Sequence, residues 1–273
     1  MKMIKKVALL HSLCSVGKAS LTNMIPVLST MGVEVCPIPT VMLSTHTGGY
    51  GIPARQAVDA NYIRACADHY RANDITFDAI FVGYLGCVNM TSSVQYFLEQ
   101  FPEALVILDP IMGDHGKLYS GLTPDYATEF LSLCSYANII VPNLTEASLL
   151  TGIAYDENNT KDYLELLCNA LHNTGVEHVI ITGIPSADGK KGIALSSNLE
   201  LELLFLEGEP ADFHGTGDVF DAVLTGEYMQ GAPLKECIMK AHEFARRCIQ
   251  ESIAACKPER EGIQLESNLS RLV

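Results

Sequence analysis

The sequence predicts an α/β fold with three α/β/α layers around a mostly parallel central sheet. Short apolar runs alternate along the chain with longer stretches of helical pattern, which is typical of βαβ units. Such units give a buried, mostly parallel sheet with helices on both of its faces. Near residue 190 the rhythm changes to two apolar runs joined by a short polar link, so we expect a hairpin at one sheet edge.

Six short apolar runs are the predicted strands of this sheet. They lie at residues 6–11, 34–42, 79–84, 105–108, 139–141 and 178–182. Helical patterns follow at residues 54–70 and 90–101, the edge hairpin is expected at 191–197 and 201–208, and helices at 218–228 and 234–255 close the chain before a polar tail. No repeat, low-complexity tract or linker interrupts the pattern, so we expect a single domain over residues 1–273.

Composition excludes several functional classes. A net charge of −14 argues against nucleic acid as a main partner, although a small phosphate ligand contacts only its local site. No apolar stretch reaches the roughly 18 residues of a membrane span. The nine cysteines are scattered without a CxxC pair, which is typical of buried free thiols in a reducing compartment. We therefore expect a cytoplasmic protein with no membrane or nucleic-acid partner.

Common catalytic motifs are missing from the chain. The first strand leads into HSLCSVGKAS, which has one glycine where a dinucleotide-binding loop needs several, and Ser12 stands where a P-loop needs its first glycine. GxSxG and HExxH are absent. His11, His46 and His214 are expected after strands, but they show no metal-ligand spacing and are most simply polar residues with satisfied hydrogen bonds.

The stretch FHGTGDVFDAV, residues 213–223, carries the strongest chemical signal. Gly215, Thr216 and Gly217 directly precede a helical pattern, so their N–H groups and the helix start favour an anion. Asp218 follows in the first helical turn. It is either an ordinary acidic residue at a helix start or a base that accepts the proton of a hydroxyl attacking a phosphoryl group.

Five ordered stretches together resemble the pyridoxal kinases of the ribokinase-like superfamily. GTGD at 215–218 is similar to the superfamily signature. TVMLSTHTGGYG (40–51), VGYLG (82–86), DPIMGDHGKLY (109–119) and VPNLTEASLLTG (141–152) match the same family in order and spacing. The overall pattern resembles the bacterial pyridoxal or pyridoxamine kinases. Sugar kinases of the superfamily fit less well, because the chain has no insertion for a large lid domain.

The resemblance implies ATP-dependent phosphorylation of the 5′-hydroxymethyl group of pyridoxal, pyridoxine or pyridoxamine. It implies that Asp218 is the catalytic base. Three residues are implied to form the anion hole for the γ-phosphate: Gly215, Thr216 and Gly217. Four residues are implied to contact the ring of the substrate, together with Asp218: Ser12, Val41, Thr47 and Tyr84.

The resemblance also implies a nucleotide and metal site. Five residues are implied to lie near the nucleotide: Asp109, Lys117, Asn143, Glu146 and Thr182. Asp109 and Glu146 would support Mg²⁺ bound with ATP, and a monovalent cation such as K⁺ is a further candidate. Residues 114–121 resemble the flap that closes over the substrates, and the family leads us to expect a homodimer.

Other interpretations stay open. Lys117 fits a solvated loop lysine, Tyr84 a buried strand end, Ser12 a helix cap and Asn143 a turn residue. At the level of function, the alternative is a hydroxymethylpyrimidine kinase, which has the same machinery and a different ring. A vitamin B6-binding protein without activity is a third hypothesis, against which the intact GTGD turn argues, because a binder needs no base.

Overall fold

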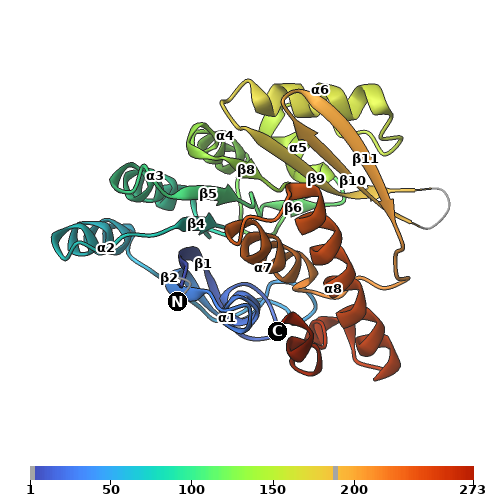
Figure 1. Cartoon of the computed structure of the whole chain (residues 1–273), viewed down its shortest axis with the longest axis horizontal. Helices are drawn as coiled ribbons and strands as arrows, with labels where there is room; N and C mark the ends of the chain where they lie inside the picture. Colours follow the sequence, from blue (N-terminus) through green and yellow to red (C-terminus); the bar gives the residue numbers. More distant parts are fainter. Residues whose placement is uncertain (1–3, 187–189) are drawn as a thin grey trace.

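A nine-stranded sheet runs through the molecule in the order β11-β10-β9-β8-β5-β4-β1-β2-β3 (Figure 1). The computed structural model describes residues 4–186 and 190–273. Neighbouring strands are parallel from β9 across to β2. These strands are β1 (Lys6–Val16), β2 (Glu34–Thr45), β4 (Ala79–Val82), β5 (Leu105–Leu108), β8 (Ile139–Ile140) and β9 (His178–Pro185).

Helices cover both faces of the sheet, which confirms the predicted three layers (Figure 1). One face carries α1 (Leu21–Thr30), α7 (Thr216–Met229) and α8 (Leu234–Ala254). The other carries α2 (Ala60–Ala72), α3 (Thr91–Gln100), α4 (Asp125–Leu131), α5 (Leu144–Thr151) and α6 (Lys161–His172).

Strand β4 shows why its sequence is apolar throughout. Its side chains alternate between the two faces of the sheet, and a hydrophobic core lies on each face. Ala79 and Phe81 pack in the core beneath α1, α7 and α8, whereas Ile80 and Val82 pack in the core beneath the other five helices. No position of this strand meets water, so none of them is polar.

Both sheet edges are antiparallel, and only one of them was expected. The hairpin of β10 (Lys191–Ser197) and β11 (Glu200–Leu206) confirms the prediction. At the other edge β3 (Arg55–Ala57) pairs with β2, so the prediction of a helix from residue 54 was wrong at its start. Helix α2 begins at Ala60, where the Asp59 side chain accepts the N–H of Asn61 and caps the helix. All three residues of β3 are exposed, so no apolar pattern marked this strand.

Smaller elements complete the chain. A two-stranded hairpin, β6 (Gly113–Asp114) and β7 (Lys117–Leu118), stands apart from the main sheet. Short 3-10 turns lie at Val88–Met90, Cys134–Tyr136, Glu259–Glu261 and Glu266–Leu272. The expectation of a merely polar tail after residue 257 was wrong, because Ile263 and Leu265 are buried in the same core as α1, α7 and α8.

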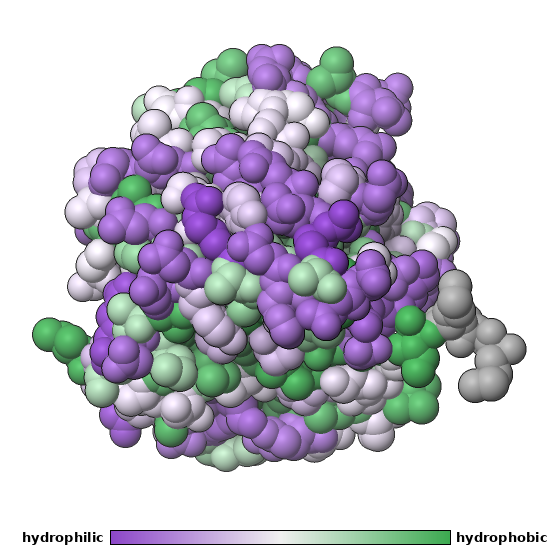
Figure 2. All heavy atoms as spheres, turned by 90° about the vertical axis from the view of Figure 1, so that its left-hand side faces the viewer, coloured by the Kyte–Doolittle hydropathy of each residue, from purple (hydrophilic) through white to green (hydrophobic). Residues whose placement is uncertain are grey.

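One face of the molecule is mostly hydrophilic (Figure 2). Figure 2 shows one face on which hydrophilic side chains predominate and apolar ones occur in small groups. Among the residues that the structure describes, no helix has the length and apolar character that crossing a membrane demands.

Candidate active site

Most of the polar residues singled out by sequence lie where the parallel strands end and α7 begins. Ligands of open α/β sheets bind at this carboxyl edge. Strands β1 and β2 run several residues beyond β4, to Val16 and Thr45, and their register shifts between His11 and Leu13. These extensions are longer than the sequence suggested, and that of β1 carries Ser12.

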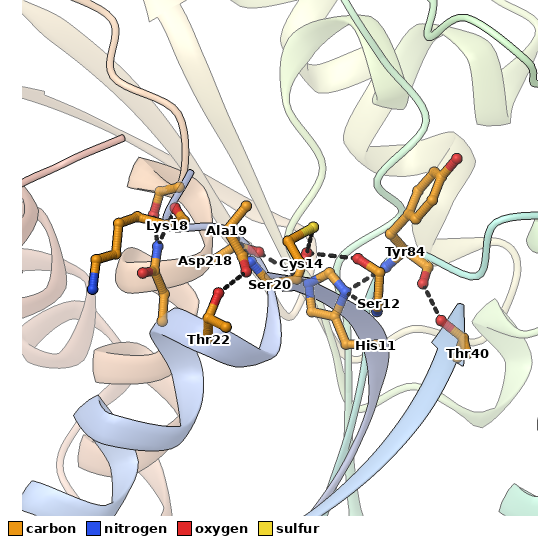
Figure 3. A network of polar contacts seen from close by, with 12 residues as sticks. His11, Ser12, Cys14, Lys18, Ala19, Ser20, Thr22, Thr40, Tyr84 and Asp218 are labelled. Atoms are coloured by element: carbon orange, nitrogen blue, oxygen red, sulfur yellow. Dashed lines mark hydrogen bonds and ion pairs between the residues drawn. The ribbon is translucent and has the colours of Figure 1, made fainter. Parts of the chain in front are cut away.

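Asp218 lies at the centre of a buried hydrogen-bond network (Figure 3). Its Oδ1 is 2.9 Å from Nε2 of His11, and its Oδ2 accepts the backbone N–H of Ser20 at 2.7 Å. The residue is 8% exposed, so one side of the carboxylate still reaches the outside. Asp218 belongs to the first turn of α7, where the helix dipole favours a negative charge.

The GTG turn is held by a residue that the sequence did not reveal. Gly215 has φ +83°, and a Cβ on it would lie 1.8 Å from the Lys18 carbonyl oxygen, so only glycine fits. The amide of buried Asn23 donates to the carbonyl oxygens of Lys18 (2.7 Å) and Gly215 (3.2 Å). Helix α7 begins at Thr216, and no side chain of the described residues caps its first turn. Its leading N–H groups are therefore available to an anion.

Three of the four predicted ring contacts lie close to this network. Val41 and Tyr84 are buried in one small apolar cluster. Burial raises the pKa of Tyr84, and the nearby Arg55 guanidinium acts in the opposite direction. Ser12 is buried, and its Oγ is 2.7 Å from Oγ of Ser20, which is the N-cap of α1; Ser12 itself therefore does not cap that helix.

The fourth predicted ring contact, Thr47, is exposed in the loop after β2, outside that apolar cluster. His46, directly before Thr47, stacks on His214, which directly precedes the GTG turn. Their ring centroids are 4.1 Å apart. His46 Nδ1 accepts the N–H of Gly48, so its Nε2–H donates to the Arg260 carbonyl oxygen at 2.7 Å. Burial lowers the pKa of both histidines. The loop after β2, the GTG turn and the C-terminal segment are thereby joined.

Asn143 and Glu146 form a capping box at the start of α5. Asn143 Oδ1 accepts the N–H of Glu146 at 2.9 Å, and Glu146 Oε2 accepts the N–H of Asn143 at 2.8 Å. The other carboxylate oxygen of Glu146 accepts the N–H of Met112 at 3.0 Å. Burial and the nearby Asp109 raise the pKa of Glu146, while these backbone donors oppose the rise. Glu146 thus anchors the loop after β5 as well as the helix.

Asp109 faces an acidic partner that was not predicted. Asp221, one helical turn after Asp218, is buried beside it. Burial and this neighbour raise the pKa of Asp109, and burial also raises the pKa of Asp221. A carboxylate between Phe220 and Ala222 on a buried helix face was a signal in the sequence, because a lone charge is rarely buried without a partner.

The carboxylates fit a magnesium ion that arrives with its nucleotide. Within residues 4–186 and 190–273, no three His, Cys, Asp or Glu side chains converge to hold a metal ion by themselves. Mg²⁺ usually keeps several waters and is bound through one or two carboxylates plus substrate phosphates. Burial and neighbouring carboxylates raise the pKa values of Asp109 and Glu146, so a cation beside them would stabilise their charged forms.

The remaining predicted residues divide into two groups. Thr182 lies beside Asn143 and donates its N–H to the Pro142 carbonyl oxygen at 2.9 Å. Lys117 lies on the exposed β6–β7 hairpin, inside the predicted flap of residues 114–121, and forms no ion pair with the described part of the chain. The hairpin is tied to α5, because Gly116 donates its N–H to Thr145 Oγ1 at 2.9 Å.

Comparison with known proteins identifies the family of the chain. The family model of the phosphomethylpyrimidine kinases matches residues 25–261. A pyridoxal kinase of Arabidopsis thaliana is 31% identical over 215 residues, which cover 73% of this chain and 66% of the plant enzyme's length. The chain therefore spans slightly less than two thirds of that relative.

Two solved structures share the whole fold. A Bacteroides thetaiotaomicron protein described as a phosphomethylpyrimidine kinase, in a crystal form with pyridoxal, gives a TM-score of 0.89 at 33% identity, covering 99% of this chain and 96% of that one. A pyridoxal kinase of Lactobacillus plantarum gives 0.91 at 32% identity, covering 99% and 97%. The chain therefore belongs to the phosphomethylpyrimidine kinase family, in which its relatives include pyridoxal kinases.

Proposed function

We propose that the protein transfers the γ-phosphoryl group of Mg·ATP to the 5′-hydroxymethyl group of a vitamin B6 ring. One observation carries this proposal: the Asp218 carboxylate lies at the start of a helix whose first N–H groups are not capped by any side chain in the described part of the chain. Anion site and carboxylate are thus adjacent, as transfer to an alcohol requires. The N–H groups stabilise the charge on the transferring group, and the carboxylate accepts the proton of the attacking hydroxyl.

The other residues position the two substrates. Asp109 would hold Mg²⁺, with Glu146 beside it fixing the loop after β5. When bound, the ion neutralises charge shared by the β- and γ-phosphates. Val41 and Tyr84 would supply the wall for a planar ring, and Ser12 a hydroxyl for its nitrogen. Thr47 and Lys117 would reach the substrates only after their loops move, because both are exposed here.

A vitamin B6 ring is preferred over hydroxymethylpyrimidine for two reasons. The HTG and VGYLG stretches resemble those of pyridoxal kinases, and the structurally similar Bacteroides protein contains pyridoxal. A storage protein is disfavoured, because binding alone needs no buried carboxylate beside an anion site. We further propose a single-domain enzyme that forms a homodimer in the cytoplasm, where nine free cysteines stay reduced.

An ADP-release assay with four acceptors tests the proposal. Pyridoxal, pyridoxine, pyridoxamine and hydroxymethylpyrimidine are each incubated with Mg·ATP, and the product is identified by mass spectrometry. We expect a 5′-phosphate from at least one B6 vitamer at a higher kcat/KM than from the pyrimidine. A higher value for the pyrimidine would assign the enzyme to the alternative reaction. ADP release that none of the four acceptors stimulates would contradict both.

A further inference from the structure

We infer that His11 is the positioning residue of the catalytic base: its Nε2–H holds Asp218 in the orientation that receives the substrate proton. This inference rests on the proposed function of Asp218. It concerns a histidine that the sequence marks only as a polar residue after a strand, and it follows from the network in Figure 3.

The neighbours of His11 determine which of its two ring nitrogens carries the proton. Its Nδ1 accepts two backbone N–H groups, from Ser12 at 2.8 Å and from Tyr84 at 3.2 Å. A ring nitrogen that accepts hydrogen bonds carries no proton, so the proton of the neutral ring is on Nε2. That nitrogen is 2.9 Å from Asp218 Oδ1 and therefore donates to it. Two backbone N–H groups orient the imidazole, and the imidazole orients the carboxylate.

The ring has no room to turn away. His11 is 0% exposed, and a Cβ on Gly83 would lie 2.7 Å from its Cδ2 and Nε2, so the backbone after β4 lies against the ring. Both nitrogens are already paired, and flipping the ring would leave two backbone donors facing carbon. The N–H is therefore fixed in direction before any substrate binds, and preorganised donors of this kind need no rearrangement during the reaction.

The second oxygen of Asp218 is fixed by a strained residue. Ser20 donates its N–H to Oδ2 from a backbone at φ 61° and ψ −135°. Such a conformation costs about 1–3 kcal/mol for a residue other than glycine and persists only where the surroundings impose it. Each carboxylate oxygen thus accepts one protein donor and keeps lone pairs free for the substrate hydroxyl.

The same ring joins the base to the proposed substrate pocket. Ser12 and Tyr84, whose N–H groups His11 accepts, are two of the polar residues predicted to contact the vitamin ring. Because one imidazole contacts both the pocket residues and the base, His11 links the position of the proposed pocket to that of the carboxylate. Misplacement of a reacting group by about 1 Å costs up to about 100-fold in rate.

Two substitutions of His11 separate its two contacts. In His11→Asn the side-chain oxygen takes the place of Nδ1 and still accepts the backbone N–H groups, but nothing reaches Asp218. In His11→Gln the amide nitrogen takes the place of Nε2 and still donates to Asp218. His172→Asn is the matched control, because both nitrogens of His172 also have partners, Val176 O and Ser196 Oγ, at the distant end of α6.

We expect His11→Asn to lower kcat by about 10- to 100-fold with KM for ATP and the vitamer within about threefold. His11→Gln should keep kcat within about threefold of wild type, and His172→Asn should lower only the Tm. Equal kcat values for the wild type and His11→Asn, or an equal loss of kcat in both His11 variants, would overturn the inference but not the proposed function. If His11→Asn does not fold, His11→Gln alone is compared with the wild type. A kcat within about threefold then supports the inference, and a larger loss overturns it. A wild type inactive on every acceptor would overturn the proposed function together with the inference.

Discussion

His11 and Asp218 are 207 positions apart in sequence, yet they share the central hydrogen bond of the site. Local pattern could not predict this contact, because a polar residue at a strand end and an acidic residue at a helix start are each ordinary by themselves. Asp218 was found through the glycines that precede it. His11, Asn23 and Asp221 were missed because their roles depend on partners from other elements, which only the folded sheet brings together.

Gly83→Ala tests the packing that holds His11. The new methyl group would lie 2.7 Å from the buried imidazole, and neither the ring nor the backbone has space to yield. We expect unfolding to become easier by about 1–3 kcal/mol, as is usual for overpacked interiors. We also expect a lower kcat, because the displaced ring no longer holds Asp218. Thermal melts and the kinase assay measure both, and an unchanged Tm with full activity would show that the ring is free to move.

His214→Gln tests the stacked histidines. Burial lowers the pKa of His46 and His214 below the unfolded value of about 6.5. Just below about pH 6.5 the unfolded chain therefore binds more protons than the folded chain. The free energy of unfolding is thus not reduced by this pair above about pH 6.5, and it falls as the solution is acidified. Because His214→Gln removes one of the two groups, its Tm should fall less than that of the wild type between about pH 7.5 and pH 5.5. A loss as steep as that of the wild type would mean that His214 titrates normally.

At the scale of elements, Asn143 and Glu146 at the start of α5 have a local function as well as the proposed one. The sequence places both residues just after the apolar run predicted as the strand at 139–141, and in the structure they cap the helix that begins at Leu144. The sequence could not show that Glu146 also accepts the N–H of Met112, because that contact depends on where the loop after β5 returns.

Glu146→Gln should therefore have two effects. Both carboxylate oxygens of Glu146 accept backbone N–H groups, and glutamine replaces one of these oxygens with an NH₂ group that cannot accept. We therefore expect the free energy of unfolding to fall by about 1–3 kcal/mol. If the charge also supports Mg²⁺, the variant needs more Mg²⁺ for half-maximal turnover. Thr145→Val is the control: Thr145 also accepts a backbone N–H, from Gly116, but carries no charge. A Mg²⁺ titration curve like that of the wild type would assign Glu146 to the fold only.

Elements buried on both sides were predicted most accurately, because a short continuous apolar run is typical of a strand covered on both faces. The strands at 105–108 and 178–182 illustrate this, and their structural counterparts begin at the expected residues. Strand β3 was missed because its three exposed residues show no apolar pattern. Strands β1 and β2 run further than expected because their ends continue to pair with each other beyond β4, as in Leu13 with Met42 and Cys14 with Leu43, after serines have interrupted the apolar run of β1.

At the scale of the whole molecule, the β3 edge of the sheet is open to another chain. Strand β3 is the last in the sheet order, and Val16, Met42 and Ile52 are exposed apolar residues on β1, β2 and the loop leading to β3. An unpaired edge strand with exposed apolar neighbours is a ready site for association. The proposed homodimer would form there.

Ile52→Asp tests that surface, because Ile52 is 99% exposed and its replacement cannot disturb the core. We expect the wild type to sediment as a dimer of the 29.7 kDa chain and the variant to shift toward the monomer. Leu166→Asp, at a 54% exposed apolar residue on α6, should leave the dimer intact. Equal sedimentation of the wild type and Ile52→Asp would place the interface elsewhere or show that none exists.

The central claim is that Asp218 accepts the proton of the substrate hydroxyl, and single-turnover kinetics of Asp218→Asn test it most directly. Asparagine keeps the size of the side chain but cannot take a proton, so pyridoxal and Mg·ATP should still bind. We predict that the rate of phosphoryl transfer falls by about 10²–10⁴-fold, the usual contribution of a general base. Transfer by Asp218→Asn within a few-fold of the wild-type rate, with both substrates bound, would contradict the account.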